Sequence, residues 1–263
     1  TNASSISSLS LTKKMPSPLL LLMLLLLFSL FADGVQLIVV NNCKETLWPG
    51  ILASSGQKTP LGGGFSLSSS QRQVLQVSLN WSGRIWARQG CRFDHRSGRG
   101  KCQTGDCGGL LQCKGAGGSP PATVVEMTFG TRTSPLHFYD VSLIDGFNVP
   151  VSLVPLGVGG GQGGRQGCGA AACEADLNAC CPSWLAVENQ GKVVGCKSPC
   201  LATGSSRYCC TGEFSGAEKC PSTVVGRLFK AICPSAYSHP FDEATGLRTC
   251  RAPRYVITFC PPS

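Results

Sequence analysis

Residues 98–113 read GRGKCQTGDCGGLLQC, a segment in which glycines surround three closely spaced cysteines. The chain of 263 residues holds 17 cysteines, and all of them lie after an apolar leader. A cytosolic enzyme rarely carries so many thiols, whereas an exported chain meets an oxidising environment in which thiols pair. The sequence therefore predicts an extracellular fold held together by disulfide bonds.

The leader has the composition of an export signal. Residues 19–31 are almost all leucine or phenylalanine, and such a run is too short to span a bilayer but suits the apolar core of a signal peptide. Gly34 supplies a small residue for cleavage. We therefore expect a leader and signal peptide over residues 1–34, with Met15 or an upstream residue as the initiator, and a mature chain that begins at Val35.

Zinc binding is the alternative use of the cysteines, because Cys196 and Cys200 have a short, finger-like spacing. The chain has only three histidines, and none lies at zinc-finger spacing. Adjacent cysteines at 180–181 and 209–210 suit disulfides, because neighbouring cysteines usually have different partners. We expect no metal and no cofactor, and the spacings alone leave the disulfide pairing open.

The chain is basic, with 23 Lys and Arg against 14 Asp and Glu and a net charge of +9. A positive protein is attracted to anionic surfaces such as microbial walls and membranes. The basic residues are scattered from Lys44 to Arg254, which together with export argues against nucleic acid as a partner.

The first half of the chain after the leader predicts mainly β structure. Apolar and polar residues alternate over residues 75–79, 84–88 and 125–129, as half-buried strands require. Clusters of Gly, Pro and Ser separate these short segments, which favours a sandwich or barrel over a parallel α/β sheet. A last strand over residues 255–259 is expected to close the sheet.

The second half predicts a loop-rich region held by disulfides. Residues 157–167 read GVGGGQGGRQG, which predicts a mobile surface loop and a boundary. In the cysteine-dense segment that follows, one helix is predicted to begin at Ser222 and to place these residues on one face: Val224, Val225, Leu228, Phe229 and Ile232. Because each native disulfide contributes about 2–5 kcal/mol, we expect resistance to heat and proteases.

Residues 98–113 match the signature segment of thaumatin-like proteins at each of its defining Gly, Thr, Asp and Cys positions. Four further segments extend the resemblance over almost the whole mature chain: VNNC ending at Cys43, GRIWAR from Gly83, FYDVSLIDGFNVP from Phe138 and FCP around Cys260. The sequence is therefore similar to the plant pathogenesis-related, osmotin-like and zeamatin-like proteins of this family.

The resemblance implies a mainly β fold, a thaumatin-like β-sandwich with a disulfide-rich lobe that contains one longer helix. The sandwich core is expected over residues 35–88, 120–174 and 234–263. A small disulfide-stapled loop region is expected over residues 89–119, and the disulfide-rich helical lobe over residues 175–233.

The resemblance also implies the disulfide pairing. The implied pairs are Cys43–Cys260, Cys91–Cys102, Cys107–Cys113, Cys168–Cys250, Cys173–Cys233, Cys181–Cys196, Cys200–Cys209 and Cys210–Cys220. Cys181 is preferred to Cys180 because the family cysteine precedes a proline, as Cys181 precedes Pro182. Cys180 is then a free thiol and a departure from the family pattern.

Defence members of the family have a cleft lined by one Arg, one Glu and three Asp, and the resemblance places these at Arg84, Glu126, Asp140, Asp145 and Asp242. Glycoside hydrolysis needs one protonated and one ionised carboxyl group. The hypothesis assigns Glu126 as the acid and Asp145 as the base or nucleophile, with the other three residues binding substrate. Strand alternation predicts that Glu126 points away from the main core.

Two further features have a functional and a structural interpretation. The rings of Phe138, Phe147 and Tyr237 would stack on sugars or simply pack in the core. Asn80 lies in the sequon Asn80-Trp81-Ser82, which predicts N-glycosylation in the secretory pathway.

These observations predict a secreted, antifungal plant defence protein of the apoplast, monomeric, that binds β-1,3-glucan or microbial surfaces through an acidic cleft. The expected partners are β-1,3-glucan or the fungal cell wall and anionic microbial membranes. Three alternatives stay open: an endo-β-1,3-glucanase using Glu126 and Asp145, an inhibitor of a secreted microbial hydrolase acting through residues 157–167, and a purely structural network of Arg84 and the acids.

Overall fold

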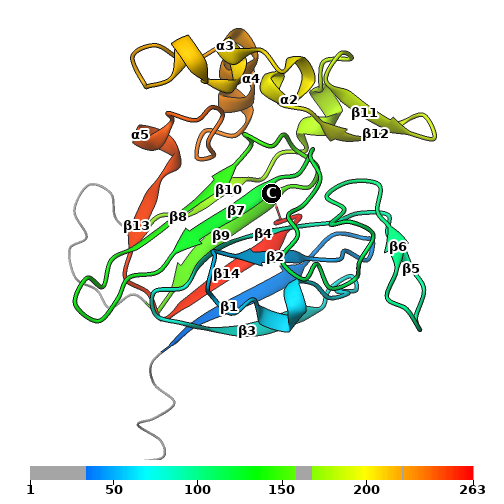
Figure 1. The fold of residues 1–263 in the computed structure, drawn as a ribbon, viewed down its shortest axis with the longest axis vertical. Helices are drawn as coiled ribbons and strands as arrows, with labels where there is room; N and C mark the ends of the chain where they lie inside the picture. The colour runs from blue at the N-terminus through cyan, green and yellow to red at the C-terminus, as the bar shows by residue number, and fades with distance from the viewer. Residues whose placement is uncertain (1–33, 158–167, 221, 263) are drawn as a thin grey trace, which may run out of the picture. The chain divides into compact units, whose positions relative to one another are not determined.

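Two five-stranded β-sheets form the framework of the computed structural model, which describes residues 34–157, 168–220 and 222–262 (Figure 1). The first sheet has the order β10-β9-β14-β1-β3 and consists of β1 (Gly34–Asn41), β3 (Arg72–Ser78), β9 (Val151–Leu156), β10 (Ala171–Cys173) and β14 (Arg254–Phe259). The second sheet has the order β13-β8-β7-β4-β2 and consists of β2 (Gly50–Ala53), β4 (Ser82–Trp86), β7 (Val124–Thr128), β8 (His137–Ser142) and β13 (Arg248–Cys250). Two hairpins add β5 (Arg92–Phe93) with β6 (Gly100–Lys101), and β11 (Ala186–Asn189) with β12 (Lys192–Cys196).

The hydrophobic core lies between the two sheets. Alternate residues of each strand are buried there, including Leu37 and Val39 of β1, Ile257 of β14, Val125 of β7 and Val141 of β8. Burying one face of each sheet is the main favourable contribution to folding of a sandwich. The predicted mainly β fold, with its disulfide-rich part and few helices, is confirmed.

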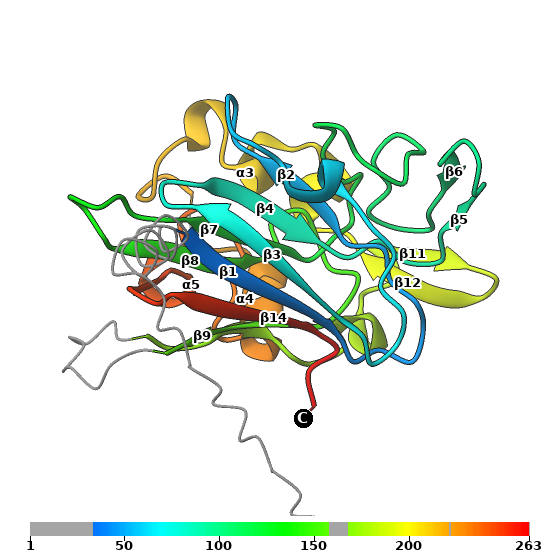
Figure 2. The same cartoon turned by 90° about the horizontal axis from the view of Figure 1, so that it is seen from below.

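The last strand occupies the middle of the first sheet. β14 pairs parallel with β1 and antiparallel with β9 (Figure 2). The register places Val39 opposite Ile257, so that both apolar side chains enter the core from adjacent strands. The disulfide Cys43–Cys260 follows directly beyond the paired strands and ties their ends together.

Helices are short and lie mainly at one end of the sandwich, at the top of Figure 1. They are α2 (Pro199–Thr203), α3 (Ser206–Cys209), α4 (Val224–Ile232), α5 (Glu243–Gly246) and the 3₁₀ helices η1 (Pro60–Gly63), η2 (Leu177–Cys180) and η3 (Gly212–Phe214). Among the described residues, no helix has both the length and the apolar character needed to cross a membrane.

The longest helix differs from its prediction at its start and on its face. α4 begins at Val224 rather than Ser222, because the Thr223 hydroxyl accepts a hydrogen bond from Gly226 N–H and caps the helix. Only Phe229 of the predicted apolar face is fully buried, whereas Val224 is 74% exposed. The apolar stripe is therefore wider than the surface that the helix covers.

The described residues contain eight disulfides, in the pairing that the resemblance implied. Cys180 is left as an exposed free thiol at the end of η2. Apart from the boundary residues Gly34 and Gly157, the predicted leader and the predicted loop over residues 157–167 lie outside the described residues.

Candidate functional site

Three neighbouring strands of the second sheet carry charged side chains at the same level. Arg84 of β4 pairs with Glu126 of β7, and Glu126 pairs with Asp140 of β8. Because directly paired residues project to the same face, the three side chains form one ladder. Val125 and Met127, which flank Glu126, are buried in the core. The ladder therefore lies on the outer face, and the prediction that Glu126 points away from the core is confirmed.

Arg84 contacts two carboxylates at once. Its Nη2 lies 3.3 Å from Glu126 Oε1, and its Nη1 lies 3.8 Å from Asp145 Oδ2. Asp145 comes from the turn after β8, next to Gly146, whose φ is +85°. A Cβ at Gly146 would lie 2.5 Å from the carbonyl oxygen of Cys196, so this close approach requires glycine. The turn thus delivers Asp145 to the ladder.

Burial raises the pKa of two carboxyl groups in the ladder, those of Glu126 and Asp140. Burial raises the pKa of Glu126, Arg84 lowers it, and Asp145 raises it. Burial and then the Glu126 carboxylate raise the pKa of Asp140 to about 8, with only a partial offset from Arg84. The hypothesis gave the proton to Glu126, but the larger rise in pKa falls on Asp140, because its strongest charge interaction, with Glu126, acts in the same direction as burial. At neutral pH Asp140 can therefore donate a hydrogen bond.

Asp242 belongs to a different hydrogen-bond network. Its carboxylate accepts hydrogen bonds from Ser238 N–H and Oγ at 3.0 Å and from Thr245 Oγ1 at 2.6 Å, and lies 2.8 Å from Lys230 Nζ. Burial alone would raise the pKa of Asp242, but hydrogen bonds from Lys230, Thr245 and Ser238 outweigh burial and lower it. Asp242 precedes α5 and is not one of the strand-paired residues of the ladder, and within the described residues no ion pair joins it to Arg84.

Tyr237 links the two groups of acids electrostatically. Burial raises the pKa of its hydroxyl, and Asp140, Glu243, Asp242 and Glu126 raise it further. The phenol therefore lies within electrostatic reach of both groups. Tyr237 was predicted to stack on sugars or to pack in the core, and Glu243 was not predicted as a site residue, although it directly follows Asp242 in the HPFDEAT segment.

The other two predicted sugar platforms have different surroundings. Phe147 is fully buried in the core, which supports its structural interpretation. Phe138 is 42% exposed and pairs with Thr128 on the outer face of the same sheet as the ladder. Of the three rings, Phe138 is the one that presents a substantial surface to a ligand.

Asn80 lies in the turn between β3 and β4 with a left-handed φ of 63°. The next residue, Trp81, is buried and its Nε1–H donates a hydrogen bond to the Lys58 carbonyl at 3.2 Å. Asn80 itself is exposed, and its glycosylation stays a prediction.

A groove of about 680 Å³ runs beside the ladder, and we call it the outer groove. Arg84 and Glu126 contribute to its wall, whereas Asp140, Asp145 and Asp242 are not part of its lining. The remaining wall is rich in hydroxyl and amide groups, contributed by Ser54, Ser55, Gln57, Thr59, Ser82 and Thr128. Such a surface offers many hydrogen bonds and little net charge to a ligand.

Residues 41–261 of the chain match the Thaumatin family. A thaumatin-like protein of Arabidopsis thaliana is 48% identical over 245 residues, which cover 92% of this chain and 96% of that protein. Pathogenesis-related protein 5 of the same plant is 47% identical, with 84% of this chain and 88% of that protein covered. Pathogenesis-related thaumatin-like protein 3.5 of Cryptomeria japonica is 43% identical, with 92% and 97% covered.

A solved structure, a β-1,3-glucanase domain (GH64) from Clostridium beijerinckii, has a similar fold with a TM-score of 0.52. It is 9% identical in sequence, and 86% of this chain and 98% of that chain are covered. At this identity the likeness concerns the fold alone. The family match and the identities of the plant proteins establish that this chain belongs to the Thaumatin family.

Proposed function

We propose that the chain is a secreted defence protein that binds a neutral β-1,3-glucan chain in the outer groove. The observation that carries this proposal is the groove lining, in which hydroxyl and amide groups surround the Arg84–Glu126 pair. Sugars are recognised by polar groups of this kind placed in a concave site. Relatives named as pathogenesis-related proteins support a role in defence.

The Arg84–Glu126 pair suits sugar hydroxyls because each partner keeps free hydrogen-bonding capacity. Their side chains are 44% and 39% exposed, and the guanidinium has donors beyond those directed at Glu126 and Asp145. Charged groups form stronger hydrogen bonds with neutral partners than neutral groups do. The eight disulfides fit a protein that works outside the cell.

Calorimetric titration with linear β-1,3-gluco-oligosaccharides tests the proposal. Glu126→Gln removes the charge but keeps the size, and the loss of one charged hydrogen bond predicts an affinity about tenfold lower. Glu188→Gln is the matched control, because Glu188 is exposed on β11 and does not line the groove. Absence of binding by the wild-type chain, or equal losses in the two variants, would refute the proposal.

Hydrolysis of the glucan is a second candidate function, favoured by the protonation of the ladder. Burial and the Glu126 carboxylate raise the pKa of Asp140 to about 8, while Glu126 and Asp145 both contact the Arg84 guanidinium. A glycosidase needs one carboxyl group as proton donor and a second as base or nucleophile. If the chain cleaves glucan, we propose Asp140 as a candidate proton donor beside the Glu126 and Asp145 pair.

An assay for new reducing ends separates the two functions. Wild-type protein incubated with linear β-1,3-glucan produces new reducing ends only under the hydrolase hypothesis. Asp140→Asn and Asp145→Asn should then each abolish cleavage without abolishing binding. Binding without new reducing ends would leave the binding function as the complete description.

A further inference from the structure

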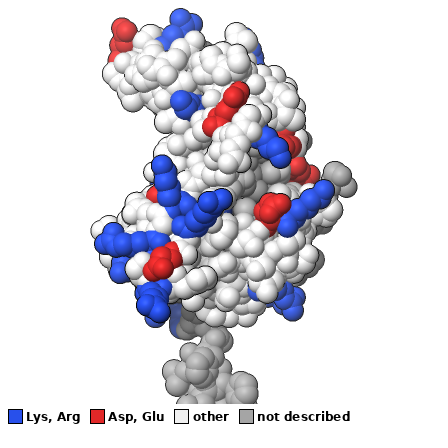
Figure 3. Space-filling view, turned by 90° about the vertical axis from the view of Figure 1, so that its right-hand side faces the viewer, with Lys and Arg blue, Asp and Glu red and all other residues white. Residues whose placement is uncertain are grey.

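The β5–β6 hairpin gathers positive charge on one side of the molecule. Within ten residues it holds four exposed cations, Arg92, Arg96, Arg99 and Lys101, and one acid, Asp94. Figure 3 views the side of the molecule on which β5 and β6 lie, and blue side chains gather there. The basic residues are therefore not simply scattered, as the sequence had suggested, because four of them gather on this hairpin.

Within the part of the chain that the structure describes, the cations of the hairpin have no acidic partners. In the ranges 34–157, 168–220 and 222–262, no ion pair includes any of the four side chains. The Asp94 carboxylate instead accepts hydrogen bonds from Ser97 N–H and Oγ at 2.8 Å and from Arg96 N–H at 3.2 Å. The single acid of the cluster is thus used to shape the turn.

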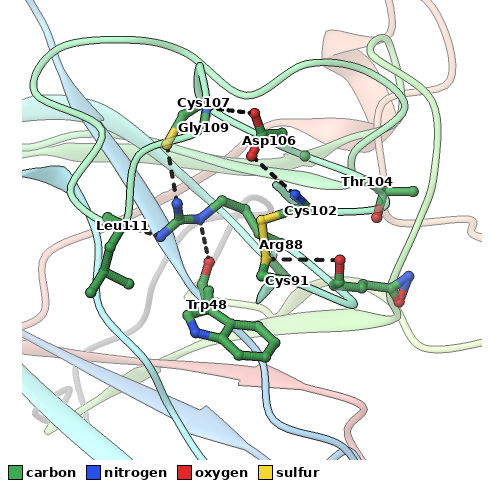
Figure 4. Close-up of a disulfide and its surroundings, with 12 residues drawn as sticks. Trp48, Arg88, Cys91, Cys102, Thr104, Asp106, Cys107, Gly109 and Leu111 are labelled. Atoms are coloured by element: carbon green, nitrogen blue, oxygen red, sulfur yellow. Dashed lines mark hydrogen bonds between the residues drawn. A yellow bond between two sulfur atoms is a disulfide. The ribbon is translucent and has the colours of Figure 1, made fainter. Parts of the chain in front are cut away.

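Two of these cations face each other directly. Arg92 and Lys101 are cross-strand partners, and like charges in this position destabilise a hairpin. The hairpin is nevertheless held by the Cys91–Cys102 disulfide (Figure 4). A bound anion would reduce the electrostatic repulsion between these like charges.

The opposite face of the hairpin is anchored to the protein. Phe93 packs edge-on against Trp48, with ring centroids 6.3 Å apart, and the Arg88 guanidinium carbon lies 5.4 Å from the Phe93 ring. Alternation along the strands therefore turns Arg92 and Lys101 toward solvent. These contacts hold the hairpin in place. The side of the hairpin that carries Arg92 and Lys101, which we call its basic face, is therefore fixed in position.

A second groove, of about 690 Å³, lies next to the end of the hairpin that carries the Cys91–Cys102 disulfide, and we call it the hairpin groove. Gly90 and Gln103 lie just outside β5 and β6, two residues along the chain from Arg92 and Lys101, and both line the groove. A Cβ at Gly90 would lie 2.3 Å from the Gln103 side chain, so these residues are in close contact. The groove therefore begins within two residues of Arg92 and Lys101.

The lining of the hairpin groove suits a sugar ring. Trp48 is half-buried and offers part of its flat indole, and Gln89 and Gln103 offer amide groups. Among its charged residues, Lys44 and Lys192 are balanced by Glu45 and Asp176. The groove lining carries no net charge. The positive charge of the combined surface of groove and hairpin therefore comes from the hairpin.

We propose that the hairpin groove and the basic face of the β5–β6 hairpin together bind an acidic polysaccharide, a chain of uronic acid residues. The groove would hold a pyranose ring, and the arginines would bind carboxylates, which match their fork of donors. Adjacent strands space Arg92 and Lys101 about 5 Å apart at the backbone, a separation comparable with one sugar residue. This surface shares no lining residue with the outer groove and takes an anionic rather than a neutral polysaccharide.

A lipid bilayer fits the same surface less well. Proteins that bind at a membrane interface insert apolar side chains below the headgroups. The hairpin turn, residues 94–98, reads DHRSG and has no apolar side chain, while the nearby Phe93 ring packs against Trp48. A flexible, hydrated polysaccharide can instead contact the hairpin and the hairpin groove at the same time.

Two variants with equal net charge test the proposal with oligogalacturonate as the probe. The hairpin variant carries Arg92→Gln, Arg96→Gln, Arg99→Gln and Lys101→Gln. The control variant carries Arg72→Gln, Arg207→Gln, Lys219→Gln and Arg254→Gln, which are exposed positions outside the hairpin. Four exposed charge contacts predict an affinity about tenfold lower for the hairpin variant and a change below about twofold for the control.

Three outcomes would overturn the proposal. The first is no binding of oligogalacturonate by the wild-type chain. The second is an equal loss in both variants, which would show that only net charge matters. The third is tighter, hairpin-dependent binding to vesicles of phosphatidylserine and phosphatidylcholine, which would identify a membrane as the partner.

Neutral β-1,3-gluco-oligosaccharide serves as the second ligand for the same proteins. We expect the hairpin variant to bind it as the wild type does, because the hairpin does not line the outer groove. Failure of glucan binding alone would refute the proposed function but not this inference. Melting curves of both variants check that the fold is intact, and the hairpin variant should be at least as stable as the wild type.

Discussion

Asp140→Asn is expected to stabilise the protein at neutral pH. Asp140 lies on β8 beside Glu126, and in the described residues its carboxylate makes neither a hydrogen bond nor an ion pair. Burial and the Glu126 carboxylate raise its pKa from 3.8 to about 8. The folded protein therefore keeps a proton that the unfolded chain releases.

The size of the effect follows from this difference in pKa. Between about pH 4 and pH 8 the folded state binds the extra proton, so the contribution of Asp140 to stability is complete below pH 4 and is lost as the pH rises to 8. At pH 7 the loss is about 4 kcal/mol. Asparagine is neutral in both states, so Asp140→Asn should recover this amount at pH 7, raise Tm by about 10 °C and change little at pH 3.

Guanidinium unfolding at pH 7 and pH 3, with the disulfides intact, measures the difference. Asp145→Asn is the matched control, because Asp145 is 43% exposed and its pair with Arg84 contributes only about 0–1 kcal/mol. A loss of stability in Asp140→Asn at pH 7 would refute the reasoning. So would an equal gain at both pH values, since a gain that arises from ionisation must vanish in acid.

Three further changes test other parts of the structure. Asp242→Asn should destabilise the protein by about 3 kcal/mol, because it leaves Lys230 without its partner at 2.8 Å, and melting curves at pH 7 should show the loss. Because the pKa of Asp242 is lowered, its contribution should disappear as the pH falls, the opposite of Asp140. Arg88→Lys should cost about 2 kcal/mol in unfolding experiments, since lysine cannot reproduce the buried guanidinium's hydrogen bonds (Figure 4). Alkylation of the denatured, unreduced protein should modify Cys180 alone, and a second modified cysteine on mass spectrometry would contradict the pairing.

The alternation of apolar and polar residues was sufficient to predict the strands and the direction of the Glu126 side chain. Alternation over residues 125–129 requires that Glu126 and Val125 point to opposite faces, and the structure shows this. The alternation of apolar and polar residues does not predict the order of strands in a sheet, because that order depends on how the strands pack together. The central place of β14, parallel to β1, is therefore a property of the tertiary structure.

The sequence by itself determined the fold family, the disulfide-rich character and the residue types of the candidate site. Only the tertiary structure decided which of those residues act together. Register brings Arg84, Glu126 and Asp140 into one ladder, and a glycine turn adds Asp145. Asp242 carries the same side chain but is held by Lys230 in another network, so its pKa falls while that of Asp140 rises. A carboxylate's ionisation depends on burial and neighbouring charges, and these are fixed by contacts between residues far apart in the chain.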